Sequence, residues 1–222
     1  MSDARITARA FHDAGEVDDW RVLFWGAYAF YRIESFADGA RFVSAIAGAA
    51  EATGHFPDVD LRPEGVTVRT FSREDGALSE RDIELARQIS AAARELELEP
   101  QPAQVQSVGI AVAQDADTDV RPFWVAAFGY RHLGLEDAID PHRRNPHLWF
   151  HELEPPKAGR GRIHIDVSVP ADQAEARVAD ALAAGGRIAD DSHAPEWWTL
   201  ASPDNHGVDI AAWPDFENYD GG

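Results

Sequence analysis

The first hundred residues alternate between strand-like and helix-like hydrophobic patterns. DWRVLFWGAYAFYRI, residues 19–33, and GVTVRTFS, residues 65–72, are rich in aromatic and β-branched side chains, as is typical of strands. Residues 36–54 and 82–99 instead repeat apolar side chains at helical spacing. The predicted stripes are Phe36, Ala40, Val43, Ala47 and Ala50 in the first helix, and Ile83, Leu85, Ala86, Ile89 and Ala93 in the second. This order predicts an α+β fold in which helices cover one face of an antiparallel sheet.

The second of these helices has signals at both ends. Ser79, with Asp82 three residues later, predicts a capping box at its start. Pro100 and Pro102 end it because proline has no backbone N–H to donate to the helix. We therefore expect a first domain over residues 1–98, a linker over residues 99–104 and a second domain over residues 105–222.

The second segment contains a weak internal repeat. Its first unit is a strand, VQSVGIAVA, a helix from about residue 120 to residue 130, and a strand, HLWFHEL. Its second unit is a strand, RIHIDVSVP, a helix, QAEARVADALAAGG, and two strands, WWTLASP and GVDIAAW. Such self-similarity predicts a duplicated β-α-β-β-β architecture.

Charge and composition narrow the classes of partner. Acidic residues number 39 and basic residues 20, for a net charge of −19, so we exclude nucleic acid and anionic membranes as partners. A neutral or cationic small molecule fits this charge better, although the acidity also serves simply to keep a protein soluble. The chain has no cysteine, which excludes disulfides and thiolate chemistry. It has no signal-like N-terminus and no apolar run near the roughly 20 residues that cross a bilayer, so we expect a cytoplasmic protein.

The first segment carries a family resemblance. AEATGHFPDVDLRPEGVTVRTFSREDGALSERDIELA, residues 50–86, resembles the core of the pterin-4a-carbinolamine dehydratases, and the likeness extends over about residues 1–98. The resemblance implies a metal-free removal of water from a pterin carbinolamine, for which imidazole is suited because it titrates near neutral pH.

Position by position, the resemblance implies a degenerate dehydratase site. Glu51, His55 and Asp82 match catalytic positions, whereas Phe56 and Thr67 stand where the family has its second and third histidines. Loss of a general acid or base typically costs about 10²- to 10⁴-fold in rate. We therefore expect Phe56 to pack, or to stack on a flat, pterin-like ligand.

The second segment resembles another family. AFGYRHLG, GRIHIDVSVP and LASPDNHGVDI resemble the glyoxalase-like, vicinal-oxygen-chelate proteins, whose paired modules form a cupped sheet that often holds a divalent metal. The ligand positions implied are Ser107, His151, His164 and Asp209, of which Ser107 is a poor ligand. Two histidines and a carboxylate suit Fe, Zn, Mn or Ni. An offset of one or two residues would turn Trp149 inward in place of His151.

Other residues near this site have both a structural and a functional interpretation. Trp149, Trp197, Trp198 and Trp213 either line a metal-free cup that buries a small organic molecule or belong to an ordinary core. DPHRRNPHLWF, which holds His142 and His147, predicts a solvated loop.

Three functional hypotheses follow. The preferred one is a small-molecule enzyme of lyase type whose pocket lies in the second domain, where the metal acts as a Lewis acid. The first domain then serves as a pterin-type binding or oligomerisation module through His55 and Phe56. The alternatives are a working pterin carbinolamine dehydratase in the first domain, which needs no cofactor, and a non-catalytic protein that sequesters a small molecule or drug. Homo-oligomers are common in both families, so we expect one here.

Overall fold

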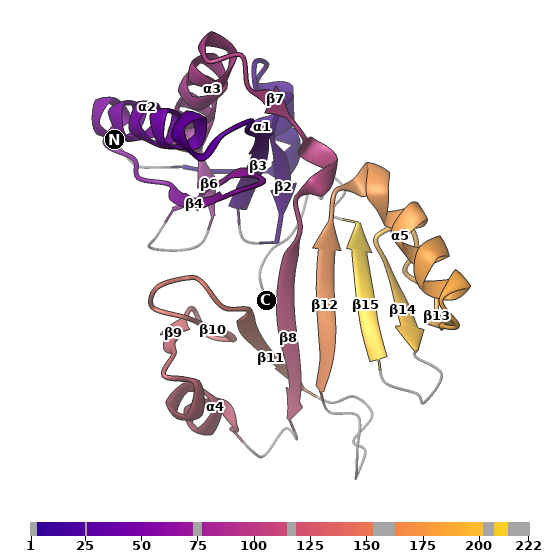
Figure 1. Ribbon diagram of the computed structural model, residues 1–222. Coiled ribbons are helices and arrows are strands. Elements are labelled where there is room, and N and C mark those ends of the chain that lie inside the picture. Colours follow the sequence, from indigo (N-terminus) through magenta and orange to yellow (C-terminus); the bar gives the residue numbers. More distant parts are fainter. Residues whose placement is uncertain are drawn as a thin grey trace. The chain divides into compact units, whose positions relative to one another are not determined.

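The computed structural model describes residues 4–24, 26–72, 77–114, 119–152, 163–201 and 207–212. These residues fall into two compact units, one ending at Val105 and one over Gln106–Ala212 (Figure 1). The segment predicted as a linker, residues 99–104, contains β7 (Glu99–Pro100) and the 3₁₀ turn η1 (Pro102–Gln104). β7 pairs with β3 (Gly26–Arg32) of the first unit.

The first unit is an antiparallel sheet with helices on one face, as the sequence predicts. Its main strand order is β2-β3-β5-β4, with β7 pairing to β3, and β1 pairs with β6 in a separate two-stranded sheet. The core lies between this sheet and α2 and α3, where Tyr31, Val66 and Val68 pack with Phe42 and Ile89. The remaining bounds are β1 (Arg5–Ile6), α1 (Ala8–Asp13), β2 (Arg21–Leu23), α2 (Phe36–Thr53), β4 (Asp58–Arg62), β5 (Gly65–Thr70), β6 (Leu78–Ser79) and α3 (Glu80–Glu95).

Two local expectations in the first unit need correction. Residues 19–33 form two strands, β2 and β3, which pair antiparallel. They meet at Gly26, where φ is +119° and an added Cβ would lie 2.5 Å from the carbonyl oxygen of Thr70, so only glycine fits. Helix α2 buries Gly39, Phe42, Ile46 and Ala50, and Phe36 of the predicted stripe is 57% exposed. Both stripes have helical spacing, and the buried one carries two large side chains, Phe42 and Ile46, whose burial stabilises the fold.

The second unit is an eight-stranded sheet built from two modules, which confirms the predicted duplication. Strand order is β13-β14-β15-β12-β8-β11-β10-β9. In each module the first and last strands pair in parallel, and the two first strands, β8 and β12, pair antiparallel at the centre. The bounds are β8 (Ser107–Gln114), α4 (Arg121–Phe128), β9 (Arg131–Leu133), β10 (Asp137–Ile139), β11 (His147–Glu152), β12 (Ile163–Val169), α5 (Ala171–Ala183), β13 (Arg187–Asp190), β14 (Trp197–Ala201) and β15 (Gly207–Ala212).

Both helices of the second unit cover the same face of its sheet. α4 packs on Ile110 and Val112 of β8, and α5 packs on Val167 and Val169 of β12. Ile110 pairs with Ile165, so these alternate residues of the two strands point the same way. The opposite face, called the site face below, therefore carries the other alternate residues of each strand.

None of the helices within the described ranges is long and apolar enough to cross a membrane.

Candidate functional site

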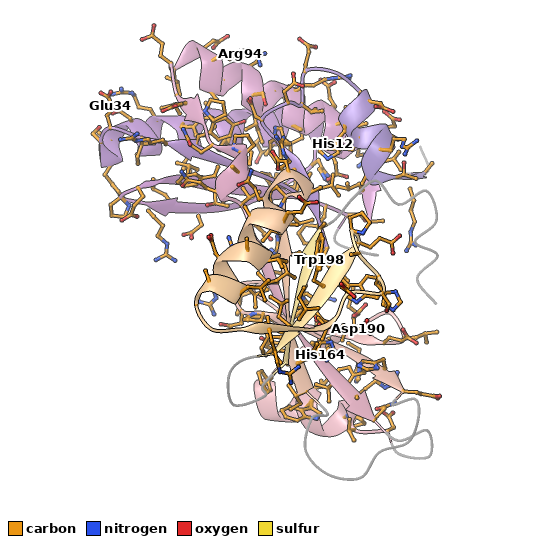
Figure 2. The ribbon with its side chains drawn as sticks, turned by 90° about the vertical axis from the view of Figure 1, so that its right-hand side faces the viewer. His12, Glu34, Arg94, His164, Asp190 and Trp198 are labelled. Atoms are coloured by element: carbon orange, nitrogen blue, oxygen red, sulfur yellow. The ribbon has the colours of Figure 1, made fainter. Side chains whose placement is uncertain are left out.

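A histidine and two aspartates meet on the site face of the second unit. His164 and Asp166 are two residues apart on β12, so they point to the same face, and Asp209 pairs with Asp166 from β15. Each offers one ligand atom, and the three atoms lie within 4.8 Å of one another. His164 Nε2 is 3.2 Å from Asp166 Oδ1 and 3.4 Å from Asp209 Oδ2 (Figure 2 labels His164). These three groups could together hold a metal ion.

The electrostatics of this cluster reflect two carboxylates held close together. Burial lowers the pKa of His164, but the hydrogen bond and charge of Asp166 and the charge of Asp209 outweigh it, so the pKa of His164 is raised. Burial raises the pKa of Asp209; a hydrogen bond from Thr199 and the charge of His164 oppose the rise, and the charges of Asp166 and Asp190 add to it. The cluster therefore favours an added positive charge.

One buried polar atom of the cluster and one beside it lack hydrogen-bond partners within the described part of the chain. They are Asp209 Oδ1 and His151 Nε2. A buried acceptor left unsatisfied costs about 1–3 kcal/mol, and more when the group is charged. A divalent cation fits this donor set, because it would offset the carboxylate charge and coordinate such oxygens and nitrogens.

His151 lies beside the cluster rather than within it. Its ring centroid is 5.8 Å from that of His164. Its Nδ1 lies 3.0 Å from the carbonyl oxygen of Glu152, and because a carbonyl only accepts, Nδ1 carries the proton. In the neutral ring Nε2 therefore presents its lone pair.

Trp149 and His151 both face the site, so the two alternatives drawn from the sequence coexist. The Trp149 ring stacks on the His151 ring, with centroids 4.6 Å apart and planes at 29°. Its Nε1–H donates to Asp166 Oδ2 across β8. Trp149 thus contacts one aspartate of the cluster and the neighbouring histidine.

The other predicted residues of this half do not join the cluster. Trp198 packs under α5, on the face opposite the cluster, while its neighbour Trp197 is on the site face and stacks on His193 with centroids 4.0 Å apart (Trp198 is labelled in Figure 2). Ser107, the first residue of β8, pairs with Ser168, whereas His164 pairs with Ala111 further along the same strand. Trp213 lies outside the described residues.

Asp166, His147 and Asp137 were not assigned to the site face from the sequence. Asp166 is a ligand candidate that the His-x-Asp spacing on a strand would have indicated. His147, expected in a loop, is buried at the start of β11 with its ring over Gly109, where an added Cβ would lie 2.4 Å from the ring. Asp137 pairs with Trp149, and burial, followed by the charge of Glu136, raises its pKa to about 7.

In the first unit, Asp82 joins the predicted histidine to the start of α3. Its side chain is fully buried. Oδ1 accepts from His55 Nε2 at 2.8 Å and from Thr70 Oγ1 at 2.6 Å, while Oδ2 accepts from the backbone N of Ser79 at 2.8 Å and from its Oγ at 2.9 Å. The predicted capping box is confirmed. Because a carboxylate only accepts, His55 Nε2 carries the proton and Nδ1 is its accepting nitrogen.

The remaining predicted residues of this half do not join that pair. Glu51 is exposed near the end of α2, and no hydrogen bond or ion pair among the described residues links it to His55 or Asp82. Phe56 is 49% exposed directly after His55. Thr67 is three residues before Thr70 on β5, so it points to the opposite face of the sheet from the Asp82 contacts.

Comparison with known proteins identifies both halves of the chain. Residues 1–92 match the family model of pterin 4 alpha carbinolamine dehydratase. A protein of Nocardia farcinica named "Putative pterin-4-alpha-carbinolamine dehydratase" is 46% identical over 94 residues, which is 95% of that protein and 42% of this chain. The chain belongs to the pterin-4-alpha-carbinolamine dehydratase family. A protein of the same name from a Roseiflexus species is 34% identical over 89 residues, 91% of its length and 40% of this chain.

Residues 107–211 match the family model of the glyoxalase-like domain, so this member of the dehydratase family carries a glyoxalase-like domain in the same chain. Both resemblances are thereby confirmed. Among solved structures, a crystal structure titled "transcriptional coactivator/pterin dehydratase" from Brucella melitensis is 22% identical, with a TM-score of 0.38, and the match covers 40% of this chain and 99% of that one.

Proposed function

We propose that the glyoxalase-like unit is a divalent-metal-dependent small-molecule enzyme of lyase type, with His164, Asp166 and Asp209 as the metal ligands. The observation that carries this proposal is the meeting of their three donor atoms within 4.8 Å. One imidazole nitrogen and two carboxylate oxygens suit Mn, Fe, Zn or Ni. Such a metal, when bound, supplies Lewis acidity toward a substrate oxygen.

The other groups on the site face give the chain's own contribution to this chemistry. A lyase reaction needs a group that takes up and releases a proton near neutral pH. Asp137, with its pKa raised to about 7, is suited to that role beside Trp149. His151 Nε2, which has no hydrogen-bond partner among the described residues, accepts a hydrogen bond from a substrate hydroxyl or amine. The net charge of −19 favours a neutral or cationic substrate.

Elemental analysis tests the metal site directly. Protein purified without a histidine tag, after exposure to Mn, Fe, Zn and Ni, is expected to hold about one metal ion per chain, and His164→Ala and Asp209→Asn are expected to lose it. His132→Ala is the matched control, because His132 is an exposed histidine on β9 of the same unit. If the wild-type protein holds no metal, the metal mechanism is wrong, and tight binding of an organic cation without product formation would identify a sequestering protein instead.

A working dehydratase in the first unit is the second candidate function. The hydrogen bond between His55 and Asp82 favours it, because it orients an imidazole whose side chain is 13% exposed. If this unit is active, His55→Ala is expected to lower turnover of a pterin carbinolamine by about 10²- to 10⁴-fold, while His164→Ala leaves it unchanged. If the wild-type protein does not turn over the pterin, the first unit serves instead as a binding or oligomerisation module, with Phe56 exposed enough to stack on a flat ligand.

A further inference from the structure

The indole of Trp149 crosses a strand to reach the candidate metal ligands. β8 lies between β11, which carries Trp149, and β12, which carries Asp166. Adjacent strands are about 4.8 Å apart, so this hydrogen bond spans roughly twice that distance. The indole can do so because the site-face side chains of β8 are small: Ser107, Gly109, Ala111 and Ala113. The small side chains of β8 thus leave room for this ring to lie across the site face.

The hydrogen bond divides the two oxygens of Asp166 between different partners. Oδ2 accepts from Trp149 Nε1, whereas Oδ1 faces His164 Nε2 at 3.2 Å. Stacking on His151 and an edge contact with His164, at 6.2 Å between centroids and 89° between planes, hold the indole in place. While Oδ2 accepts from the indole, one of its lone pairs is occupied, so Oδ1 is the oxygen that is better placed to bind a cation.

We propose that Trp149 is a positioning residue that restricts Asp166 to binding a cation through one oxygen and thereby selects against Ca²⁺. This inference rests on the proposed metal function. Ca²⁺ takes six to eight oxygen ligands and often uses carboxylates in bidentate fashion. Zn²⁺ usually binds about four ligands and Mn²⁺ about six, and both accept imidazole nitrogen together with single carboxylate oxygens.

Isothermal titration of the full chain with Mn²⁺ and with Ca²⁺ tests the proposal. Trp149→Phe keeps an aromatic ring at this position but removes the N–H. We expect its Mn²⁺ affinity to fall by about 10- to 100-fold, as for other partners of metal ligands, with no matching fall for Ca²⁺. Trp197→Phe is the control, because Trp197 lies on the same face and stacks on His193 rather than on a ligand. Its affinities for both cations should equal those of the wild-type protein.

The outcomes separate this inference from the proposed function. If Trp149→Phe keeps the wild-type ratio of Mn²⁺ to Ca²⁺ affinity, the positioning role is overturned and the metal site stands. If the wild-type protein binds neither cation, both are overturned. A measurement on the wild-type protein covers the case in which Trp149→Phe does not fold. With Zn²⁺ bound, the indole N–H of Trp149 should exchange with solvent more slowly than that of Trp197, and equal rates would refute the proposal.

Discussion

Asp137 is a carboxyl group set in an apolar part of the site face. It pairs with Leu133 on one side and with Trp149 on the other, and Ile139 follows two residues along the same strand. Burial is the main cause of its raised pKa of about 7, and the neighbouring charge of Glu136 adds to it. The ionised form is therefore the unfavourable one in the folded protein.

This shift makes stability fall as pH rises. The pKa of Asp137 is about 7 in the folded state, against an ordinary value of 3.8, so between these values the folded state binds more protons than the unfolded chain. The free energy of unfolding should decrease across that window by about 1.4 kcal/mol per pH unit, with the full penalty present above pH 7 and none below about pH 4. Asp137→Asn should remove this pH dependence. In urea denaturation, the free energy of unfolding of the variant should therefore increase relative to that of the wild-type protein as pH rises from 4 to 8. Asp60→Asn is the control because the Asp60 side chain is exposed. If the difference in free energy of unfolding between Asp137→Asn and the wild-type protein did not change with pH, the raised pKa of Asp137 would be contradicted.

Individual residues of the candidate site differ in how far the sequence predicts them. The family resemblance indicates His164 and Asp209, and strand alternation would have added Asp166 beside His164. Alternation alone cannot say which of Trp197 and Trp198 faces the site, because neighbouring strand residues always point to opposite faces. The raised pKa of Asp137 could not be predicted, because it depends on strands that are distant in sequence from it.

At the scale of the element, helix α2 shows where periodicity gives a helix but not its orientation. Its bounds follow the prediction closely, Phe36–Thr53 against residues 36–54. The predicted and the observed stripes both have helical spacing and share Ala50, so the choice between them depends on the sheet against which the helix packs. Gly39 belongs to the observed stripe, and the helix packs so closely there that an added Cβ would lie 2.4 Å from Leu61 Cδ1 and 2.9 Å from Ile33 Cδ1.

Two glycines of α2 should therefore respond oppositely to alanine. An added Cβ at Gly48 has no heavy atom within 4 Å, so Gly48→Ala should raise the free energy of unfolding by about 0.5–1 kcal/mol through helix propensity. Gly39→Ala gains the same propensity but forces the side chains of Leu61 and Ile33 to move, which should lower that free energy by about 1–3 kcal/mol. Urea denaturation of the two variants measures both effects. A shift of both in the same direction would show that the packing of α2 against β4 has been misjudged.

At the scale of the whole molecule, the two families and the duplication within the second follow from the sequence. Short strands such as β9, β10 and β13 do not, because three or four residues carry too little periodicity to be distinguished from loops. The antiparallel pairing of β8 with β12 is a contact between modules, and no pattern within either module indicates its register. That register places Trp149 and His164 on either side of Ala111. The sequence could therefore indicate the residues of the site but not which of them lie next to one another.

Asp82 both accepts from His55 and caps the start of α3, so its presence in a sequence does not by itself indicate a dehydratase site. A chain that ceased to dehydrate pterins would still need this aspartate, because Ser79 and Thr70 are buried and both donate hydrogen bonds to it at the start of α3. The presence of Asp82 therefore indicates that the start of α3 is capped, rather than that the chain is active. His55 contacts Asp82 Oδ1 at 2.8 Å, so the carboxylate that caps the start of α3 also orients this imidazole.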